Sequence, residues 1–332
     1  MPGCERDSLR AEFVRRSGWG DAGQSPLAGD ASQRRYFRLR RSQASAVVMD
    51  APPAREDVRP FARIGRHLRA LGLSAPEILA IDEANGFVLL EDLGDDTFTR
   101  VLAAGGDEAG LYGRATDVLV VLHQAGDRAL LPGLDIYLGD ALIDAAMLLP
   151  EWYVPAAIGR PATNEEIVDY RSAWRACLAS LPDMPSTLML RDYHAGNLMW
   201  LPARPGVKAC GLLDFQDAQQ GHCAYDLVSL LEDARRDVSA AVRAACIERY
   251  VDETGIDGRD FATSFALMAA QRHARIAGLF IRLARRDGKP DYLAHLLRVW
   301  PLFARALRHE ALAPLHAWVD RVLPQPRSLG AT

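Results

Sequence analysis

The strongest constraint on the fold is a change of hydrophobic period near residue 94 of this 332-residue chain. Before that point, one amphipathic helix is expected at 60–73, because Phe61, Ile64 and Leu68 recur at spacings of three and four. Four flanking segments alternate or cluster apolar residues as β-strands do: 35–40, 46–49, 78–81 and 87–90. The first quarter of the chain is therefore predicted to be rich in strands.

After residue 94 the apolar spacing becomes that of long helices. Such patterns cover residues 109–125, 164–181, 224–238, 238–250, 261–286 and 292–307. A strand at 187–190 and a hairpin over 198–213, turning near Pro205, interrupt them. Strands followed by helices predict an α+β fold in two lobes, at residues 1–92 and 93–332.

The composition is that of a globular protein with no marked charge excess. Apolar residues make up 49% and charged residues 25%, and the formal net charge is −4, which predicts neither nucleic acid nor a membrane as a partner. The five cysteines form no metal or disulfide pattern. The sequence predicts neither a secretory leader nor an apolar stretch approaching the ~18 residues that span a bilayer, so a cytoplasmic location is expected.

Three polar residues carry the clearest chemical signal. Asp192 and Asn197 lie five apart in a loop between two predicted strands, and Asp214 directly follows an apolar strand. Phosphoryl transfer to a hydroxyl needs a carboxylate that accepts the proton and oxygen ligands for Mg²⁺ on the nucleotide phosphates. The spacing predicts Asp192 as the catalytic base, with Asn197 and Asp214 as metal ligands.

The motifs around these residues resemble one known family. Residues 191–197 read Arg-Asp-Tyr-His-Ala-Gly-Asn and residues 211–216 read Gly-Leu-Leu-Asp-Phe-Gln. Together with Arg-Arg-Tyr-Phe-Arg at 34–38, they resemble the aminoglycoside phosphotransferase and choline kinase-like family, and within it the anomeric N-acetylmuramate/N-acetylglucosamine kinases of bacterial cell-wall recycling. The resemblance covers nearly the whole chain. It implies a protein-kinase-like fold, ATP and Mg²⁺ as cofactors, and phosphorylation of the C1 hydroxyl of an amino sugar.

The predicted nucleotide lobe, residues 1–92, lacks the lysine that protein kinases place on their third strand. The chain has only two lysines, Lys208 and Lys289, both far downstream. We therefore predict that Arg35 or Arg38 binds the phosphates, since guanidinium groups bind phosphate oxygens in a fork; the alternative is that both are solvated surface charges.

Two short segments complete the predicted nucleotide site. Gly29 and Ser32 form a plausible phosphate turn, although an ordinary turn would look the same. The backbone from Glu91 to Leu93 is expected at the hinge, facing the adenine edge.

Five further residues are predicted to support or contact the substrate. His194 resembles the family's loop histidine and is expected to support the loop, whereas Asp226 is expected to anchor it through backbone N–H groups. Asp217 is a candidate for a substrate contact or a second metal. Glu151 is placed at a sugar face or in helix packing, and Arg272 at a lactyl carboxylate or on a solvated helix face.

The predicted activity is therefore that of an ATP-dependent amino-sugar kinase, acting as a monomer. Two alternatives stay open: another small-alcohol kinase, such as an aminoglycoside phosphotransferase, or a catalytically silent nucleotide-binding module. A polycationic aminoglycoside would call for a densely acidic cleft, which the mixed charges of the helical half do not predict.

Overall fold

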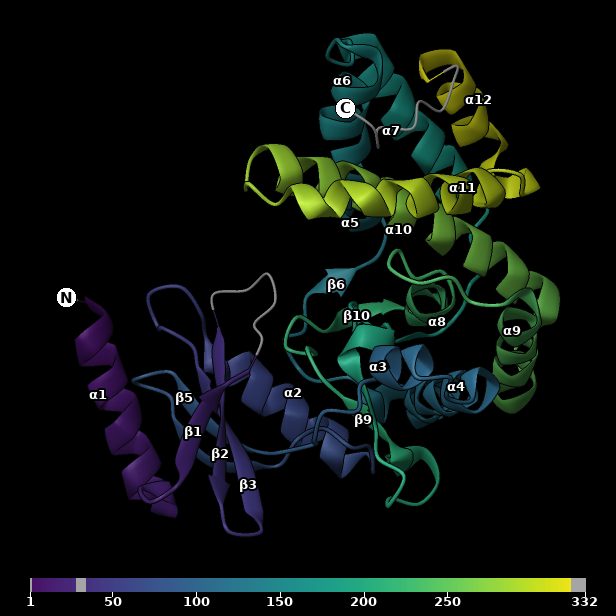
Figure 1. The fold of residues 1–332 in the computed structure, drawn as a ribbon. Coiled ribbons are helices and arrows are strands. Elements are labelled where there is room, and N and C mark those ends of the chain that lie inside the picture. The colour runs from purple at the N-terminus through teal and green to yellow at the C-terminus, as the bar shows by residue number, and fades with distance from the viewer. Residues whose placement is uncertain (1, 28–33, 324–332) are drawn as a thin grey trace. The chain divides into compact units, whose positions relative to one another are not determined.

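The computed structural model describes residues 2–27 and 34–323, which pack into two compact units (Figure 1). The first unit contains Met1–Asp107 and Gly196–Ala218, and the second contains Glu108–Ala195 and Gln219–Thr332. The chain passes from the second unit to the first within the loop at 191–197 and returns after Ala218. The lobe boundary at residue 92 stays a prediction.

The first unit is built on a five-stranded antiparallel sheet with a helix on each side (Figure 1). The predicted strands and helix of this region are present, although the helix ends at Ala70 and not at residue 73. In sheet order, the strands are β1 (Gly23–Pro26), β2 (Arg35–Arg41), β3 (Ala44–Asp50), β5 (Phe87–Glu91) and β4 (Ile78–Asp82), and the helices are α1 (Pro2–Val14) and α2 (Val58–Ala70).

Alternation along the strands sorts side chains onto two faces of this sheet. On one face, Leu39, Val48 and Leu89 pack with Phe13 and Val14 of α1 into a buried apolar cluster. Burial of side chains of this size contributes about 1.5–3 kcal/mol each relative to exposure. Residues of opposite parity in the same strands point to the other face, where the candidate site is found.

Further elements of the first unit come after the sheet in the sequence. They are α3 (Phe98–Ala103) and the predicted hairpin, formed by β8 (Leu198–Trp200) and β9 (Cys210–Leu212). The hairpin turns through Pro205 and Gly206, and Gly206 has a φ of 57°, which favours glycine. Isolated bridges join Thr97 to Met199 and Ser74 to Gly211, so the hairpin is fixed to the segments before and after the hinge.

The second unit is mainly helical, with one small sheet in the order β6-β10-β7. Its strands are β6 (Ile136–Tyr137), β7 (Ser186–Met189) and β10 (Gln219–His222). Its helices are α4 (Glu108–Ala125), α5 (Asp140–Ala146), α6 (Val154–Ile158), α7 (Asn164–Leu178), α8 (Ala224–Leu231), α9 (Ala240–Thr254), α10 (Gly258–Arg285), α11 (Leu296–Ala306) and α12 (Ala313–Val322).

The predicted helix at 224–238 is wrong in its second half. Helix α8 ends at Leu231, because Glu232 leaves the helical conformation (φ −125°, ψ 51°) and turns its carboxylate into the protein. There Glu232 accepts hydrogen bonds from His273 Nε2 at 2.7 Å and Arg243 Nη2 at 2.9 Å, and Arg305 Nη2 lies at 2.8 Å. A buried ionic network thus replaces the last turns of the expected helix.

Replacing Glu232 by Gln is expected to lower the free energy of unfolding by about 3 kcal/mol. This value is near the lower end for breaking a buried ion pair, because the partners Arg243 and Arg305 are partly exposed to solvent. Burial opposes the charge of Glu232, but the His273 hydrogen bond and both arginines outweigh it and lower its pKa from 4.5 to about 2. This stabilisation is complete above pH 4.5 and is lost as the pH falls towards 2. Urea unfolding at several pH values measures it.

The matched control for this prediction is Asp237→Asn, which removes an exposed carboxylate paired with Arg298. A surface pair of this kind contributes at most about 1 kcal/mol. Equal stability losses in the two variants, or a Glu232→Gln loss that does not shrink in acid, would contradict the assignment.

One sequence expectation about membranes needs correction. The segment Asp140–Ile158, which runs through α5 and α6, is long and apolar enough to cross a membrane by length and composition alone. Pro150, Glu151 and Pro155 interrupt the apolar residues of this segment, so the sequence shows no continuous apolar stretch there. Half of it is buried inside the protein, as in the core helix of many globular proteins.

Candidate active site

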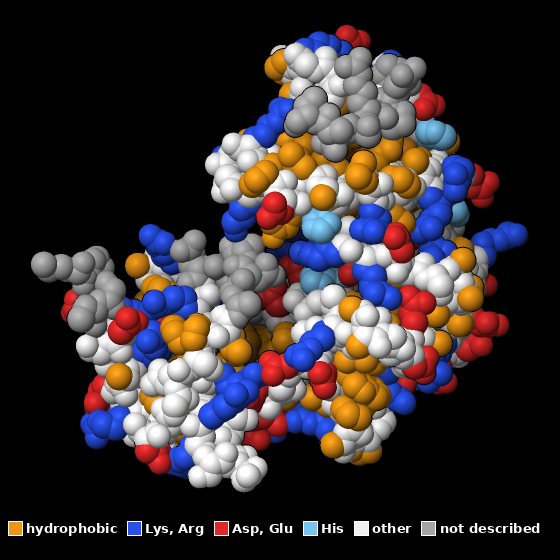
Figure 2. All heavy atoms as spheres, viewed as in Figure 1, with side chains coloured by type: hydrophobic (Ala, Val, Ile, Leu, Met, Phe, Trp, Pro, Cys, Tyr) orange, Lys and Arg blue, Asp and Glu red, His pale blue; other side chains and the backbone are white. Residues whose placement is uncertain are grey.

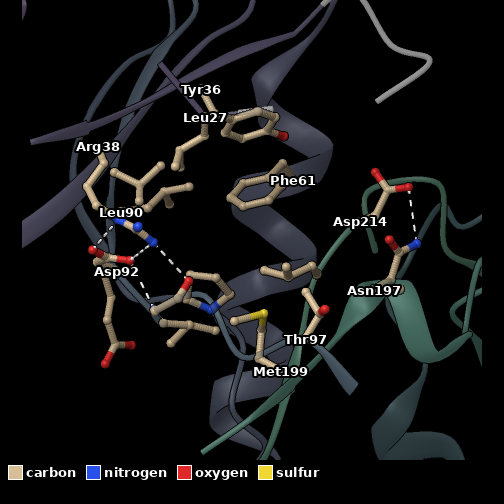
Figure 3. Close-up of a pocket in the computed structure, with 17 residues that line it drawn as sticks. Leu27, Tyr36, Arg38, Phe61, Leu90, Asp92, Thr97, Asn197, Met199 and Asp214 are labelled. Atoms are coloured by element: carbon tan, nitrogen blue, oxygen red, sulfur yellow. Dashed lines mark hydrogen bonds and ion pairs between the residues drawn. The ribbon is translucent and has the colours of Figure 1, made fainter. Parts of the chain in front are cut away.

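A cavity of about 340 Å³ opens on the face of the first unit's sheet that looks away from α1 (Figure 3). Its walls are largely apolar and come from the sheet, from α2 and from the hairpin: Val47, Leu90, Phe61, Met199 and Leu213. Phe61 is held in place by stacking on Phe215, with ring centroids 4.9 Å apart. An apolar slot with a few polar groups at its ends suits a flat heteroaromatic ring.

The predicted hinge residues line one end of this cavity. The chain leaves the sheet at the end of β5, and residues 91–94, which include Glu91 and Leu93, border the cavity. The Glu91 carboxylate is engaged by Arg204 and lies 3.6 Å from Arg69. The arrangement therefore offers this segment's backbone as the polar edge for a base.

Arg38 lines the cavity at the hinge end (Figure 3). Its guanidinium lies 2.8 Å from Asp92 Oδ2 and 2.7 Å from Asp95 Oδ1, and it donates to the Gly94 carbonyl at 2.9 Å. Burial would raise the pKa of Asp92, but hydrogen bonds from Arg38, from the Gly94 N–H and from Ser45, together with the charge of Arg38, outweigh it and lower that pKa. Two carboxylates already neutralise Arg38, so its position suits holding the hinge.

The other predicted nucleotide contacts are not brought to the cavity. Arg35 lies opposite Asp50 in the register of β2 and β3, and its Nη2 is 2.5 Å from that fully buried carboxylate. Arg6 and Arg10 of α1 also pair with Asp50, so this cluster belongs to the α1 face of the sheet. Gly29 and Ser32 lie outside the described residues.

Asn197 and Asp214 come together at the opposite end of the cavity from the hinge (Figure 3). Asn197 Nδ2 donates to Asp214 Oδ2 at 3.4 Å, and Gln216 Nε2 donates to Asp214 Oδ1 at 2.9 Å. Asp214 has a φ of 57°, a left-handed conformation that Asp tolerates better than most residues. Asp217 is exposed and lies 3.5 Å from the same Gln216 amide.

In the second unit, Asp192 sits directly after a tight turn. Its N–H donates to the Leu190 carbonyl at 2.9 Å across Arg191, whose φ is 74°. This is the rare γ-turn, which is strained for a residue with a side chain. Asp226 holds the turn by accepting the N–H groups of Leu190 at 2.5 Å and Arg191 at 2.9 Å.

His194 is buried in the second unit beside Arg235. Burial, helped by the charge of Arg235, lowers the pKa of His194 to about 4. Since Arg235 Nη1 can only donate and lies 3.3 Å from Nε2, the neutral ring carries its proton on Nδ1. A neutral, fixed imidazole supports the loop and is poorly suited to serve as the base itself.

Two arginines of α10 lie in the electrostatic neighbourhood of the same loop. Arg272 is only 3% exposed, and its positive charge acts to lower the pKa of both His194 and Asp226. In the part of the chain that the structure describes, its Nε and Nη1 atoms have no hydrogen-bond partner. Burial opposes the charge of Arg275, but Tyr225, Tyr137 and Asp192 outweigh it and raise its pKa. The sequence did not single out Arg275.

Glu151 is exposed, and it is not among the main causes of the shifted pKa values of His194, Asp226 or Arg275. It lies in the irregular helical turn Leu149–Tyr153, where Tyr153 stacks flat on Trp300 at 4.9 Å. The aromatic ring next to Glu151 in this turn is therefore engaged in packing. A substrate contact by Glu151 stays a prediction.

Comparison with known proteins connects this geometry to a family. Residues 23–262 match the phosphotransferase enzyme family. The chain belongs to this family. N-acetylmuramate/N-acetylglucosamine kinases are similar to it over nearly full length: that of Caulobacter vibrioides is 37% identical over 96% of this chain and 97% of its own. That of Pseudomonas aeruginosa is 35% identical over 94% and 93%.

Solved structures show that this phosphotransferase has the family's fold. A choline/ethanolamine kinase family protein from Mesorhizobium loti superposes with a TM-score of 0.61 at 18% identity, covering 95% of this chain and 99% of its own. An ADP-bound aminoglycoside phosphotransferase gives 0.57 at 12% identity, covering 90% and 98%. The predicted α+β, protein-kinase-like fold and the predicted enzyme class are confirmed.

The residues of the phosphotransferase fit a nucleotide with a hard cation. The apolar cavity with a backbone edge suits a base, and Asn197 and Asp214 supply oxygen donors at the other end. Among the described residues, no group of three or more His, Cys, Asp or Glu side chains could hold a metal ion. A two-donor site of this kind suits Mg²⁺ that also binds phosphate oxygens.

Proposed function

We propose that this phosphotransferase uses ATP and Mg²⁺ to phosphorylate the anomeric hydroxyl of N-acetylmuramate or N-acetylglucosamine during peptidoglycan recycling. The observation that carries the proposal is the similarity, at 34–37% identity, to four kinases named for these two sugars. The presence of Asp192, Asn197 and Asp214 supports it, because transfer to a hydroxyl requires a base and metal ligands.

Each residue has a defined part in the proposed reaction. When bound, ATP and Mg²⁺ supply the phosphoryl group and the charge that offsets its developing negative charge. Asn197 and Asp214 would hold the metal through their side-chain oxygens, and the hinge backbone at 91–94 would orient the adenine. Asp192 orients the sugar hydroxyl and accepts its proton. Asp226 stabilises the turn that precedes Asp192 by accepting the N–H groups of Leu190 and Arg191.

The two alternative functions have less support. An aminoglycoside kinase would be served by a dense acidic surface, but the face in Figure 2 shows Asp and Glu side chains interspersed with Lys and Arg. A silent nucleotide-binding module would have no use for Asp192 as well as both metal ligands. We also propose that the protein acts as a cytoplasmic monomer, without nucleic acid or membrane partners.

A coupled ADP-release assay tests the proposal against both alternatives. N-acetylmuramate and N-acetylglucosamine are expected to stimulate ADP release, and chelation of Mg²⁺ is expected to abolish it. Stimulation by aminoglycosides or choline alone would replace the proposed acceptor. Nucleotide binding without stimulation by any acceptor would favour the silent module.

We predict that Arg272 favours N-acetylmuramate over N-acetylglucosamine by binding its lactyl carboxylate. A buried guanidinium whose donors lack a hydrogen-bond partner among the described residues is suited to a carboxylate, and loss of one charge-assisted bond weakens binding by roughly 10- to 100-fold. The Arg272→Gln variant should raise KM for N-acetylmuramate by that factor. N-acetylglucosamine, which lacks the carboxylate, is the internal control, and equal changes for both sugars would refute the prediction.

A further inference from the structure

Binding of nucleotide phosphates needs a cation at the end of the cavity that Asn197 and Asp214 line. Neither Lys208 nor Lys289 lines the cavity. Arg38 is held at the hinge end by two carboxylates, and Arg35 is held on the α1 side of the sheet by Asp50. Both arginines predicted from sequence are therefore committed elsewhere in the first unit.

Arg34, directly before β2, occupies the required place. Its side chain is 9% exposed, its Nη2 lies 3.8 Å from Asp214 Oδ1, and its Nε lies 3.6 Å from Glu56 Oε2. It also bonds the hydroxyl of Tyr36, which lines the cavity beside it. These contacts bring its guanidinium next to Asp214, the predicted metal ligand that lies at the end of the cavity opposite the hinge (Figure 3).

Glu56 holds Arg34 from the other side. Asp57 caps α2 by accepting the Arg59 N–H, so Glu56 is fixed immediately before the helix. Its separation from Arg34 is that of an ion pair at longer range than the Arg38 contacts, which lie at 2.7–2.8 Å. Glu56 can therefore orient the guanidinium.

We propose that the Arg34–Glu56 pair does the work of the lysine–glutamate pair of protein kinases, with Arg34 binding the phosphates of the nucleotide. In protein kinases the lysine is on the third strand and the glutamate within a helix. Here the cation precedes the second strand and the acid precedes α2. A guanidinium fork binds two phosphate oxygens at once, and its charge does not depend on pH in the working range. The assignment rests on the proposed function only in requiring a phosphorylated nucleotide.

Binding of ATP and of adenosine, each measured by calorimetry without acceptor, tests the proposal. Arg34→Ala should weaken ATP binding by roughly 10- to 100-fold, as expected for loss of a charge-assisted contact, and leave adenosine binding unchanged. Arg34→Lys should recover part of the loss, since it restores the charge without the fork. Arg41→Ala is the matched control, because Arg41 ends the same strand and pairs with the exposed Asp21.

The outcomes separate this proposal from the proposed function. Wild-type affinity for ATP in folded Arg34→Ala, or equal loss of ATP and adenosine binding, would overturn the role of Arg34. If Arg34→Ala does not fold, Arg34→Lys with unchanged ATP affinity and unchanged kcat would overturn it as well. A wild-type protein that binds adenosine and ATP equally would overturn the proposed function together with this inference, whereas a failed sugar assay leaves the binding result intact.

Discussion

Replacement of Asp192 by Asn is expected to lower kcat by about 10²- to 10⁴-fold, the range over which a positioned general base accelerates proton transfer. The amide keeps the shape of the carboxylate but cannot accept the proton of the sugar hydroxyl. The γ-turn that precedes it uses only backbone groups and the Asp226 carboxylate, so the loop should keep its conformation. Steady-state kinetics with N-acetylglucosamine measures the loss.

Nucleotide affinity separates a lost base from a disturbed fold. The cavity is lined entirely by residues of the first unit, whereas Asp192 belongs to the second, so the variant should bind ATP as the wild type does. Asp237→Asn, an exposed change in the same unit, is the control and should retain full turnover. Near-normal turnover in Asp192→Asn would remove this residue from the role of base.

Asp214→Asn is expected to lower kcat by about 10²- to 10³-fold, the size of effect seen when one preorganised electrostatic group at a reacting centre is removed. The substitution keeps the hydrogen-bonding partners Asn197 and Gln216 within reach but replaces a charged metal ligand by a neutral one. The Mg²⁺ concentration needed for half-maximal activity should rise as well. A titration of activity against Mg²⁺ reports both changes.

The control for Asp214 lies in the same unit. Asp21→Asn removes an exposed carboxylate that pairs with Arg41, and it should change neither kcat nor the Mg²⁺ requirement. A fall in kcat for Asp214→Asn with an unchanged Mg²⁺ requirement would place Asp214 outside the metal site.

Local sequence patterns located most of the strands and long helices because apolar period is a local property. The strands β2 to β5 and the helices α4, α7, α9 and α10 fall where the spacing of apolar residues predicts them. Helix α1 was not predicted, because the residues that it contributes to the apolar cluster, Phe13 and Val14, are adjacent at its end and show no helical spacing. Helix α8 was predicted too long because Glu232 binds distant partners, which no local pattern reveals.

The candidate site shows the same division between local and distant information. Spacing along the chain picked out Asn197 and Asp214, which the hairpin brings together, and also Asp192, whose role stays a prediction. The sequence predicted Arg35 or Arg38 as the phosphate-binding cation and did not single out the neighbouring Arg34. Arg35 and Arg38 lie on opposite faces of β2 and Arg34 directly precedes it, and each pairs with a different carboxylate, from Asp50, Asp92 and Glu56 respectively.

The near absence of lysine has a practical consequence for chemical probes of this enzyme. Reagents that label kinase nucleotide sites by acylating an amine find no lysine among the residues lining the described cavity. Arg34 presents a guanidinium beside Asp214 instead, which does not react with acylating agents but does react with dicarbonyl compounds such as phenylglyoxal. Probes that acylate lysine are therefore unsuited to this cavity, which distinguishes the protein from kinases that carry the lysine.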